Sequence, residues 1–436
     1  MKAIINADVY DFNTYRKNQY VLFGRDKESC ISQTGDMKDF TGDGVDEKID
    51  AKGALLMPGL IIGHAHIYSA FVRGLSLPFT PETFTQLLEQ LWWRMDAGID
   101  LETTYHSARV YGVEHIKSGV TTIFDHHASG TSIRGTLNEL KRGFTEEAGI
   151  RALYCFETSD RFNVDECVAE NAEFAKYNHD SKCRGLFGMH ASLSVSQKTL
   201  EKVAKAQGDV PVHVHVGESL EDEILSLNNY GQRIVKRFDS FGLLKPDSIL
   251  AHCVNINDSE AEIIAQRKCA VAVNPTSNMN TSVGIPDYML MNKHGIPVMI
   301  GNDSLGANIT RCYQNMLYCM HYRTKSAWKF GYGDVLKCIH NVYGYASRML
   351  GVKLGRIEEG YEADMILVPY NVPTYMDETN AFGYMIDGIF NQYHPRDVFI
   401  GGEAKMRNYE TIFDEADIYA KARECTKKYW KRIGGI

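Results

Sequence analysis

The chain has 436 residues, with 47 Lys and Arg against 55 Asp and Glu, so its formal net charge is −8 at pH 7. This acidic balance argues against nucleic acid or an anionic membrane surface as the main partner. The longest apolar stretch, residues 53–62, is interrupted by Pro58 and Gly59 and falls short of the roughly 20 residues that span a membrane. The N-terminus lacks the apolar run of a secretion signal, so the sequence predicts a soluble, cytoplasmic protein.

The ten cysteines are scattered, without a Cys-x-x-Cys pair or a regular spacing. Disulfide frameworks belong to short secreted domains, and structural zinc sites need paired thiolates. Most of these cysteines are therefore expected to pack as small buried hydrophobic residues.

Short apolar segments rich in β-branched residues recur eight times along the middle of the chain. Longer segments with helical periodicity separate them, for example 102–118 and 137–148, each followed by a glycine placed as a helix stop, Gly119 and Gly149. Strand–helix alternation indicates a parallel α/β fold, and eight units over about 250 residues indicate a TIM barrel. The eight expected strands are 60–66, 121–127, 152–158, 185–190, 210–218, 248–253, 270–275 and 297–303.

The two ends of the chain do not fit this alternation. Residues 1–57 contain short strand-like runs such as 19–23, and residues 353–436 contain a turn and strand over 355–368, a strand at 397–400 and a final amphipathic helix at 414–433. Strands at one end alone would leave unpaired edges. We therefore expect residues 58–352 to form the barrel, and residues 1–57 and 353–436 to combine into one small β domain.

Each of the eight apolar segments ends in polar side chains. In a TIM barrel the carboxyl ends of the strands meet at one face, which carries the active site. The sequence therefore predicts an active site built from residues at these ends: His64 and His66; Asp125, His126 and His127; Glu157; His190; His213, His215 and Glu218; His252; Asn274, Ser277 and Asn278; and Asp303.

Histidines on the first and fifth strands have the spacing of metal ligands. His64 and His66 alternate on one strand, so both imidazoles face the same side and can share an ion. His213 and His215 follow the same parity, so one is expected to be a third ligand and the other a deeper barrel residue. Glu218 favours His215, because its carboxylate can then lie beside a metal-bound water.

Asp303, in a Gly-Asn-Asp-Ser turn after the eighth strand, completes the candidate ligand set. Three imidazoles and one carboxylate suit Zn²⁺ or Fe²⁺ with a water in an open position. A second ion would need a bridging group, typically a modified lysine on the fourth strand, and residues 185–190 contain no lysine. One divalent ion, zinc in preference to iron, is therefore expected, with His252 left to hydrogen-bond the water.

These motifs together resemble the amidohydrolase superfamily, in its deaminase and chlorohydrolase branch. The resemblance spans nearly the whole chain and is carried by residues 57–66 (MPGLIIGHAH), 215–218 (HVGE), 251–252 (AH), 274–278 (NPTSN), 301–303 (GND) and 355–368. Residues 91–96 (LWWRMD), 125–129 (DHHAS) and 156–163 (FETSDRFN) are similar to the SsnA-type aminohydrolases of that branch. Two positions depart from the usual pattern, with Asn302 in place of a Thr and Ala191 in place of a frequent Pro.

The resemblance implies a distorted (β/α)8 TIM barrel with a composite β-sandwich formed by the two terminal segments. It implies catalytic roles for Glu218 and His252, and it implies a metal site made of His64, His66, His215 and Asp303. Family analogy also predicts a homodimer.

The expected chemistry is hydrolytic deamination of an amino-substituted nitrogen heterocycle, such as a purine, pyrimidine, pterin or triazine. A bound divalent ion lowers the pKa of water towards about 7. Asp303 would take the proton of that water and pass it to the leaving group, Glu218 would protonate the ring nitrogen, and His252 would orient the attacking oxygen. Ammonia and a keto group are the products.

Two other functions remain open on the sequence. The same residues could open a cyclic amide or displace another leaving group such as chloride, although the missing fourth-strand lysine argues against ring opening. An inactive member of the family could serve as a scaffold, but such a protein would be expected to have lost metal ligands.

Residues that contact the substrate are expected from their position alone. Trp92 could equally be part of a helix core, and Arg161 could simply pair with Asp160. The candidates are His190, Arg73, Trp92, Glu157, Arg161 and Asn278.

Overall fold

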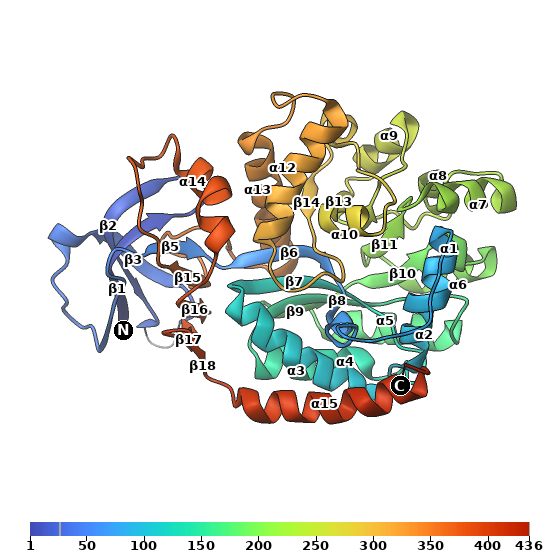
Figure 1. Ribbon diagram of the computed structural model, residues 1–436, viewed down its shortest axis with the longest axis horizontal. Coiled ribbons are helices and arrows are strands. Elements are labelled where there is room, and N and C mark those ends of the chain that lie inside the picture. Colours follow the sequence, from blue (N-terminus) through green and yellow to red (C-terminus); the bar gives the residue numbers. More distant parts are fainter. Residues whose placement is uncertain (26–27, 436) are drawn as a thin grey trace.

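A computed structural model describes residues 1–25 and 28–435 of the chain. A β-rich body and a larger α/β body lie side by side, and the chain enters the first, crosses to the second and returns (Figure 1).

The β-rich body is a nine-stranded sheet made from both ends of the chain. Its strand order is β18-β17-β16-β15-β5-β1-β2-β3, with β4 paired to β1. Strand β15 pairs antiparallel with β5, where Met365 lies opposite Pro58 and Val368 lies opposite Leu55, so the two terminal segments join at this ladder. The composite β unit expected from the sequence is confirmed. Its strands are β1 (Lys2–Tyr10), β2 (Tyr15–Phe23), β3 (Ile31–Asp36), β4 (Glu47–Asp50), β5 (Leu55–Pro58), β15 (Met365–Val368), β16 (Asp397–Ile400), β17 (Glu403–Arg407) and β18 (Glu410–Thr411).

The second body is a distorted TIM barrel with parallel strands, as expected. The fourth strand is divided at Leu186, so that β9 pairs with β8 and β10 pairs with β11. A parallel bridge between Ala65 and Asp303 joins the first and last strands of the barrel. The barrel strands are β6 (Leu60–Ala65), β7 (Val120–His127), β8 (Arg151–Phe156), β9 (Cys183–Gly185), β10 (Phe187–Ala191), β11 (Val212–Val216), β12 (Ile249–His252), β13 (Ala270–Val273) and β14 (Val298–Ile300).

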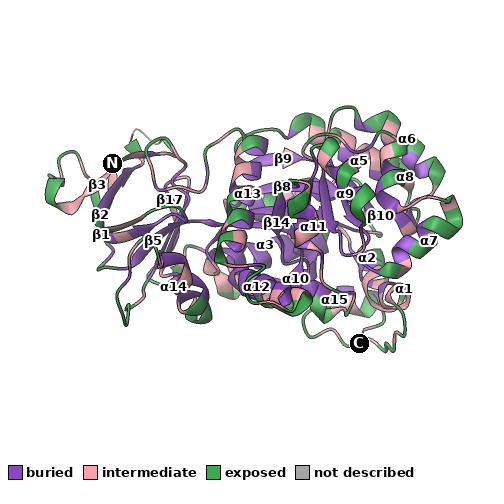
Figure 2. Cartoon of the chain, turned by 90° about the horizontal axis from the view of Figure 1, so that it is seen from above, coloured by how far each residue is buried: buried purple, intermediate pink, exposed green. Residues whose placement is uncertain are grey.

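Helices surround the barrel strands, whose residues are buried except for the half-buried Arg184 of β9 (Figure 2). Side-chain caps begin several of them: Asp100 accepts from the Thr103 backbone at the start of α3, and Asn257 forms a capping box with Glu260 at the start of α9. The outer helices are α3 (Leu101–Lys117), α4 (Thr136–Leu140) with a π-helical continuation (Lys141–Glu147), α5 (Val164–Tyr177), α6 (Gln197–Gln207), α7 (Leu220–Tyr230), α8 (Ile234–Ser240), α9 (Asp258–Gln266), α10 (Pro275–Asn280), α11 (Tyr288–Lys293), α12 (Thr310–Thr324) and α13 (Tyr332–Leu350). Helix α14 (Ala381–Asp387) lies beside the nine-stranded sheet (Figure 1).

Residues 72–98, between the first barrel strand and α3, form a separate segment that covers the carboxyl ends of the strands. This covering segment contains α1 (Phe84–Leu87), a π-helical turn (Leu88–Trp92) and α2 (Trp93–Gly98). The last helix of the chain, α15 (Glu415–Arg432), runs along α3 and ends beside α2 (Figure 1). At that end the Trp430 indole donates to the Phe71 carbonyl and the Tyr429 hydroxyl donates to the Met95 carbonyl, at 2.9 and 3.0 Å.

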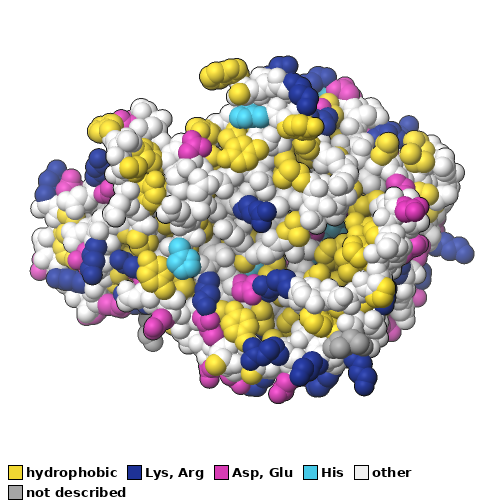
Figure 3. All heavy atoms as spheres, viewed as in Figure 1, with side chains coloured by type: hydrophobic (Ala, Val, Ile, Leu, Met, Phe, Trp, Pro, Cys, Tyr) yellow, Lys and Arg dark blue, Asp and Glu magenta, His cyan; other side chains and the backbone are white. Residues whose placement is uncertain are grey.

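No helix among the described residues is long and apolar enough to cross a membrane. On the face of the molecule shown in Figure 3, acidic and basic side chains are interspersed.

Candidate active site

The candidate site is a cavity at the carboxyl ends of the barrel strands. The barrel contributes polar residues from its strand ends, and the covering segment contributes a second, partly apolar wall. The lining includes His66, Glu157, His190, His215, Glu218, Asp222, His252, Ser277 and Asp303 on the barrel side, and Phe84, Leu88, Trp92 and Asp96 on the covering side.

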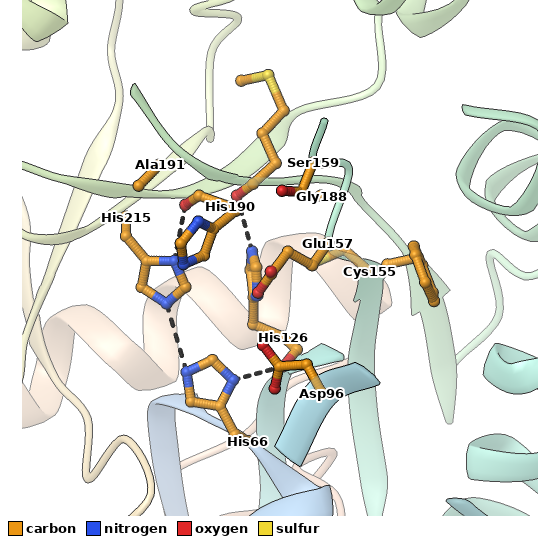
Figure 4. Close-up of polar contacts among 12 residues, drawn as sticks. His66, Asp96, His126, Cys155, Glu157, Ser159, Gly188, His190, Ala191 and His215 are labelled. Carbon is orange, nitrogen blue, oxygen red and sulfur yellow. Dashed lines mark hydrogen bonds and ion pairs between the residues drawn. The ribbon is translucent and has the colours of Figure 1, made fainter. Parts of the chain in front are cut away.

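His66 and His215 face each other across this cavity (Figure 4). The Nδ1 atom of His66 lies 2.6 Å from the His126 carbonyl oxygen, and that of His215 lies 2.7 Å from the His190 carbonyl oxygen. Each Nδ1 therefore carries the hydrogen, which leaves a lone pair on each Nε2 when the ring is neutral. The two Nε2 atoms are 3.3 Å apart, so both can bind a single metal ion.

The Asp303 carboxylate lies beside the facing Nε2 atoms of His66 and His215. Its Oδ1 lies 3.2 Å from His66 Nε2, and its Oδ2 accepts a 2.6 Å hydrogen bond from the Ser277 hydroxyl. Although burial opposes the charged imidazole, the Asp303 carboxylate raises the pKa of His66 to about 9. Burial alone would raise the pKa of Asp303, but its contacts with His66 and Ser277 hold it well below the ordinary range.

The position of Asp303 is fixed by the backbone. The amides of Asn302 and Asp303 both donate to the His64 carbonyl at 3.1 Å, and Asp303 has a φ of 56°. These bonds hold the end of β14 against the end of β6, so the residues that the sequence placed on the first and eighth strands meet.

His64 lies deeper than His66. Its Nδ1 is 2.8 Å from His213 Nε2, and its buried Nε2 has no hydrogen-bond partner among the described residues. Ligand atoms of His64, His66 and Asp303 lie within 4.8 Å of one another, as do those of His64, His215 and His252. His213 contacts His64 from behind, whereas His215 lines the cavity. An unpartnered imidazole nitrogen on His64, together with the facing Nε2 atoms of His66 and His215 and the Asp303 carboxylate, fits a divalent metal ion.

His252 and Glu218 form a second pair at the cavity. The Asn278 side-chain amide donates to His252 Nδ1 at 2.8 Å, so a neutral His252 carries its hydrogen on Nε2. That atom lies 3.6 Å from Glu218 Oε2 and 3.9 Å from Asp303 Oδ2. Burial lowers the pKa of His252 to about 4, which keeps the ring neutral near pH 7.

Glu218 has the environment of a proton donor. Burial, together with the neighbouring Asp303 carboxylate, raises its pKa well above the ordinary value. A protonated carboxyl group at the edge of a cavity can deliver its proton to a bound molecule.

An ion cluster of Asp96, Glu157 and Arg161 lies beside His66 in the same cavity wall (Figure 4 shows Asp96 and Glu157). Arg161 Nη1 lies 3.0 Å from Asp96 Oδ2, and Arg161 Nη2 pairs with Glu157 Oε1. Burial raises the pKa of Glu157 to about 7. Arg161 thus pairs with Glu157 and Asp96, while Asp160 instead accepts from the Ser196 amide and the Thr199 hydroxyl.

The structure brings most of the sequence-predicted residues to this cavity, but Arg73 is not among them. Its Nη1 lies 2.9 Å from Glu114 on α3, and the side chain is 54% exposed. The 3-10 turn after β6 (Ile67–Phe71) carries the chain away from the barrel mouth before Arg73 is reached. Trp92 and His190 line the cavity. Asn278 does not line it, but its side-chain amide donates a hydrogen bond to His252 Nδ1.

The sequence assigned no role to Asp96, Asp222 or Tyr68, and it placed Ser277 at the active-site face without a specific role; all four line the cavity. Asp96 belongs to the motif at residues 91–96 and Ser277 to the motif at residues 274–278. These motifs were the feature of the sequence that could have indicated their place in the cavity. Asp222 follows Glu218 by one helical turn, on α7.

Comparisons with known proteins agree with this geometry. A model of the amidohydrolase family matches residues 55–405. The chain is 29% identical to 5'-deoxyadenosine deaminase of Methanobrevibacter smithii over 92% of both chains. It is 30% identical to 5-methylthioadenosine/S-adenosylhomocysteine deaminase 2 of Archaeoglobus fulgidus, over 78% of this chain and 83% of that one.

Solved structures share the fold. An adenosine deaminase from Xanthomonas campestris with bound zinc superimposes with a TM-score of 0.83 at 21% identity, over 100% of this chain and 99% of that one. A zinc complex of atrazine chlorohydrolase from Arthrobacter aurescens superimposes with a TM-score of 0.81 at 19% identity, over 98% of this chain and 100% of that one.

Proposed function

The chain belongs to the amidohydrolase family, and on that premise we propose that it is a metal-dependent aminohydrolase that removes ammonia from an adenosine-type nucleoside. It acts on carbon–nitrogen bonds other than peptide bonds, by hydrolytic deamination of a nitrogen heterocycle. The observation that carries the proposal is the pair of opposed imidazole nitrogens beside Asp303, with Glu218 and His252 at the same cavity. The two relatives described above supply the adenosine-type substrate class.

One divalent ion, zinc in preference to iron, is proposed to bind His64, His66, His215 and Asp303. The orphaned His64 Nε2 and the facing Nε2 atoms of His66 and His215 support this set. When bound, such an ion makes hydroxide available at neutral pH by lowering the pKa of water towards about 7.

The proton movements are assigned to three side chains. Asp303 accepts the proton of the attacking water and later gives it to the leaving amine. Glu218 holds a proton and donates it to the ring nitrogen next to the reacting carbon. The Nε2 hydrogen of His252 orients the attacking oxygen and stabilises the tetrahedral intermediate.

The covering segment excludes water and holds the ring. Trp92 and Leu88 supply apolar surface on one side of the cavity, and His190 supplies a polar edge on the other. His190 is itself oriented by a 2.5 Å hydrogen bond between its Nδ1 and the Ser194 hydroxyl.

The decisive experiment is ammonia release by the purified, zinc-loaded protein from a panel of heterocycles. The panel contains 5'-deoxyadenosine, methylthioadenosine, adenosine, guanine, cytosine, a pterin, an aminotriazine, a chlorotriazine and a cyclic amide. Ammonia from the adenosine-type members supports the proposal. Chloride release or ring opening without ammonia would replace it with another hydrolase, and no turnover at all with a full metal site would point to a scaffold.

Family analogy supports a homodimer, and the scattered, unpaired cysteines support a location in the cytoplasm. Analytical ultracentrifugation of the zinc-loaded protein at micromolar concentration tests the assembly, with a monomer as the contradicting result.

A further inference from the structure

The three proposed histidine ligands differ in the group that holds their second ring nitrogen. Backbone carbonyl oxygens hold the Nδ1 atoms of His66 and His215, at 2.6 and 2.7 Å (Figure 4). The Nδ1 atom of His64 instead lies 2.8 Å from a side-chain atom, Nε2 of His213. A carbonyl oxygen can only accept a hydrogen bond, whereas an imidazole nitrogen can donate or accept one. Among these three histidines, His64 is therefore the one whose tautomer depends on another side chain.

His213 lies inside the barrel and is not among the residues that line the cavity. It precedes His215 by two positions on β11, so both side chains face the barrel interior. The His213 ring is fully buried, and its centre lies 4.9 Å from that of His64 and 5.1 Å from that of His126. Burial keeps the ring neutral, because a charge there would lack a carboxylate partner among the described residues.

Only one arrangement of hydrogens lets His64 bind a metal ion. The ion needs the lone pair of Nε2, so the hydrogen of a neutral His64 must be on Nδ1, and His213 Nε2 then accepts the 2.8 Å hydrogen bond. The reverse arrangement, with His213 donating, would put a hydrogen on His64 Nε2 and block it. The metal-binding arrangement places the hydrogen of His213 on Nδ1, a buried atom without a partner among the described residues. His213 must therefore act as an acceptor if His64 is to be a ligand.

We propose that His213 is a positioning residue: by accepting the hydrogen bond from His64 Nδ1, it orients that ring and fixes the tautomer whose Nε2 binds the metal ion. This inference rests on the proposed function, because it takes His64 as a ligand of the catalytic ion. Partners of this kind typically contribute about 10–100-fold to metal affinity. The two histidines of β11 thus have different roles, since His215 is proposed to bind the ion and His213 acts through His64.

Two substitutions of equal length separate the hydrogen bond from the packing of the ring. Gln can place its side-chain oxygen near the position of His213 Nε2 and accept from His64, whereas Met fills similar space and offers only a weak acceptor. Competition between the zinc-loaded protein and a chromophoric zinc chelator gives the zinc dissociation constant of each variant. We expect His213→Met to weaken zinc binding by about 10–100-fold, and His213→Gln to restore most of that loss.

His115→Met is the matched control. His115 is a fully buried histidine on α3, and its ring contacts Tyr111 and Phe144 rather than a proposed ligand. The same substitution there removes a buried imidazole, and the zinc dissociation constant should stay at the wild-type value.

A second measurement needs no substitution. Nitrogen-15 NMR of the zinc-loaded wild-type protein, labelled in its histidines, reports which ring nitrogens carry hydrogen. We expect His213 to be protonated at Nδ1 and not at Nε2, as its role of acceptor requires.

The outcomes separate this inference from the proposed function. Wild-type zinc affinity in His213→Met overturns the inference, and so does an equal loss of affinity in His213→Met and His213→Gln. A hydrogen on His213 Nε2 in the zinc-loaded protein also overturns it, whether or not either variant folds. Each of these results leaves the proposed deaminase intact. A wild-type protein that binds no zinc overturns the proposed metal-dependent function and this inference with it.

Discussion

His252 occupies a backbone conformation that few non-glycine residues adopt. Its φ is 71°, and that of the following Cys253 is 49°. Such conformations cost about 1–3 kcal/mol each and persist where surrounding contacts enforce them. Two contacts do so here: the Cys253 amide donates to the Val216 carbonyl at 2.9 Å, and Asn278 holds the His252 ring. The strain aims Nε2 at Glu218 and Asp303 rather than along the strand.

Replacing Asn278 by Ala should therefore lower kcat by about 10-fold or more with little change in KM, as the loss of a supporting hydrogen bond typically does. Steady-state kinetics of the zinc-loaded variant give both constants. Asn280→Ala, at an exposed position on the same helix, is the control and should behave as wild type. A normal kcat in Asn278→Ala would show that the ring is oriented by other contacts.

Glu218 is the residue on which the proton-donor assignment depends. Glu218→Gln keeps the shape of the side chain and removes the transferable proton, so kcat should fall by about 10²–10⁴-fold. Metal analysis of the same preparation should find the wild-type content, because Glu218 is not among the proposed ligands. Full turnover with a full metal site would exclude Glu218 as the acid.

Helix α3 carries a buried histidine that links its stability to pH. His115 Nδ1 lies 2.7 Å from the Tyr111 carbonyl, and burial lowers the pKa of His115 to about 4. The unfolded chain, with a histidine pKa of about 6.5, binds the proton more readily, so this group favours unfolding as the pH falls through the interval from 6.5 to 4. The stabilising effect of neutral His115 is present above pH 6.5.

Between pH 7 and pH 5 this residue should contribute a loss of ~2 kcal/mol in the free energy of unfolding. His115→Gln keeps a donor for the Tyr111 carbonyl and does not titrate, so its stability should change less over that interval. Urea unfolding of both proteins at the two pH values measures the difference. Equal pH dependence would assign the effect to other groups.

Hydrogen bonds from the last turn of α15 anchor the covering segment and the residues that flank it. Besides the bonds from Trp430 and Tyr429, Arg432 donates to the Gly98 carbonyl and pairs with Asp100. These contacts lie outside the cavity and fix the base of the segment that carries Trp92 and Asp96.

Trp430→Phe and Arg432→Gln should raise KM by several-fold and change kcat less, because they loosen a binding wall and leave the reacting residues in place. Lys428→Ala removes an ion pair with Glu102 from the same part of the helix and should have no such effect. Equal effects of the three substitutions on KM would mean that α15 acts only through overall stability.

Removing the metal is a test at the scale of the whole molecule. Dialysis against a chelator should abolish ammonia release and lower Tm, because an ion that binds the folded protein more tightly than the unfolded chain stabilises the fold, and removing it withdraws that stabilisation. Zinc should restore both quantities. Retained activity in metal-free protein would overturn the proposed ligand set.

Much of this architecture is visible in the sequence because it depends on local pattern. Strand parity places His64 and His66 on one side, and the strand–helix alternation predicts the barrel. Contacts between distant segments are not visible in this way. The Arg161–Asp96 pair joins the covering segment to the third strand, and Arg73 was assigned to the cavity from its nearness to His66 although the chain turns outward before it. The division at residues 57/58 and 352/353 remains a proposal.

The position of β15 and α15 has a consequence for protein synthesis. All eight barrel strands are translated before β15 can pair with β5 and before Tyr429 and Trp430 reach the covering segment. A nascent chain at that stage has the histidines of its barrel but an unanchored cavity wall. Catalytic competence is therefore expected only after residues 415–432 have been synthesised and α15 has reached the covering segment.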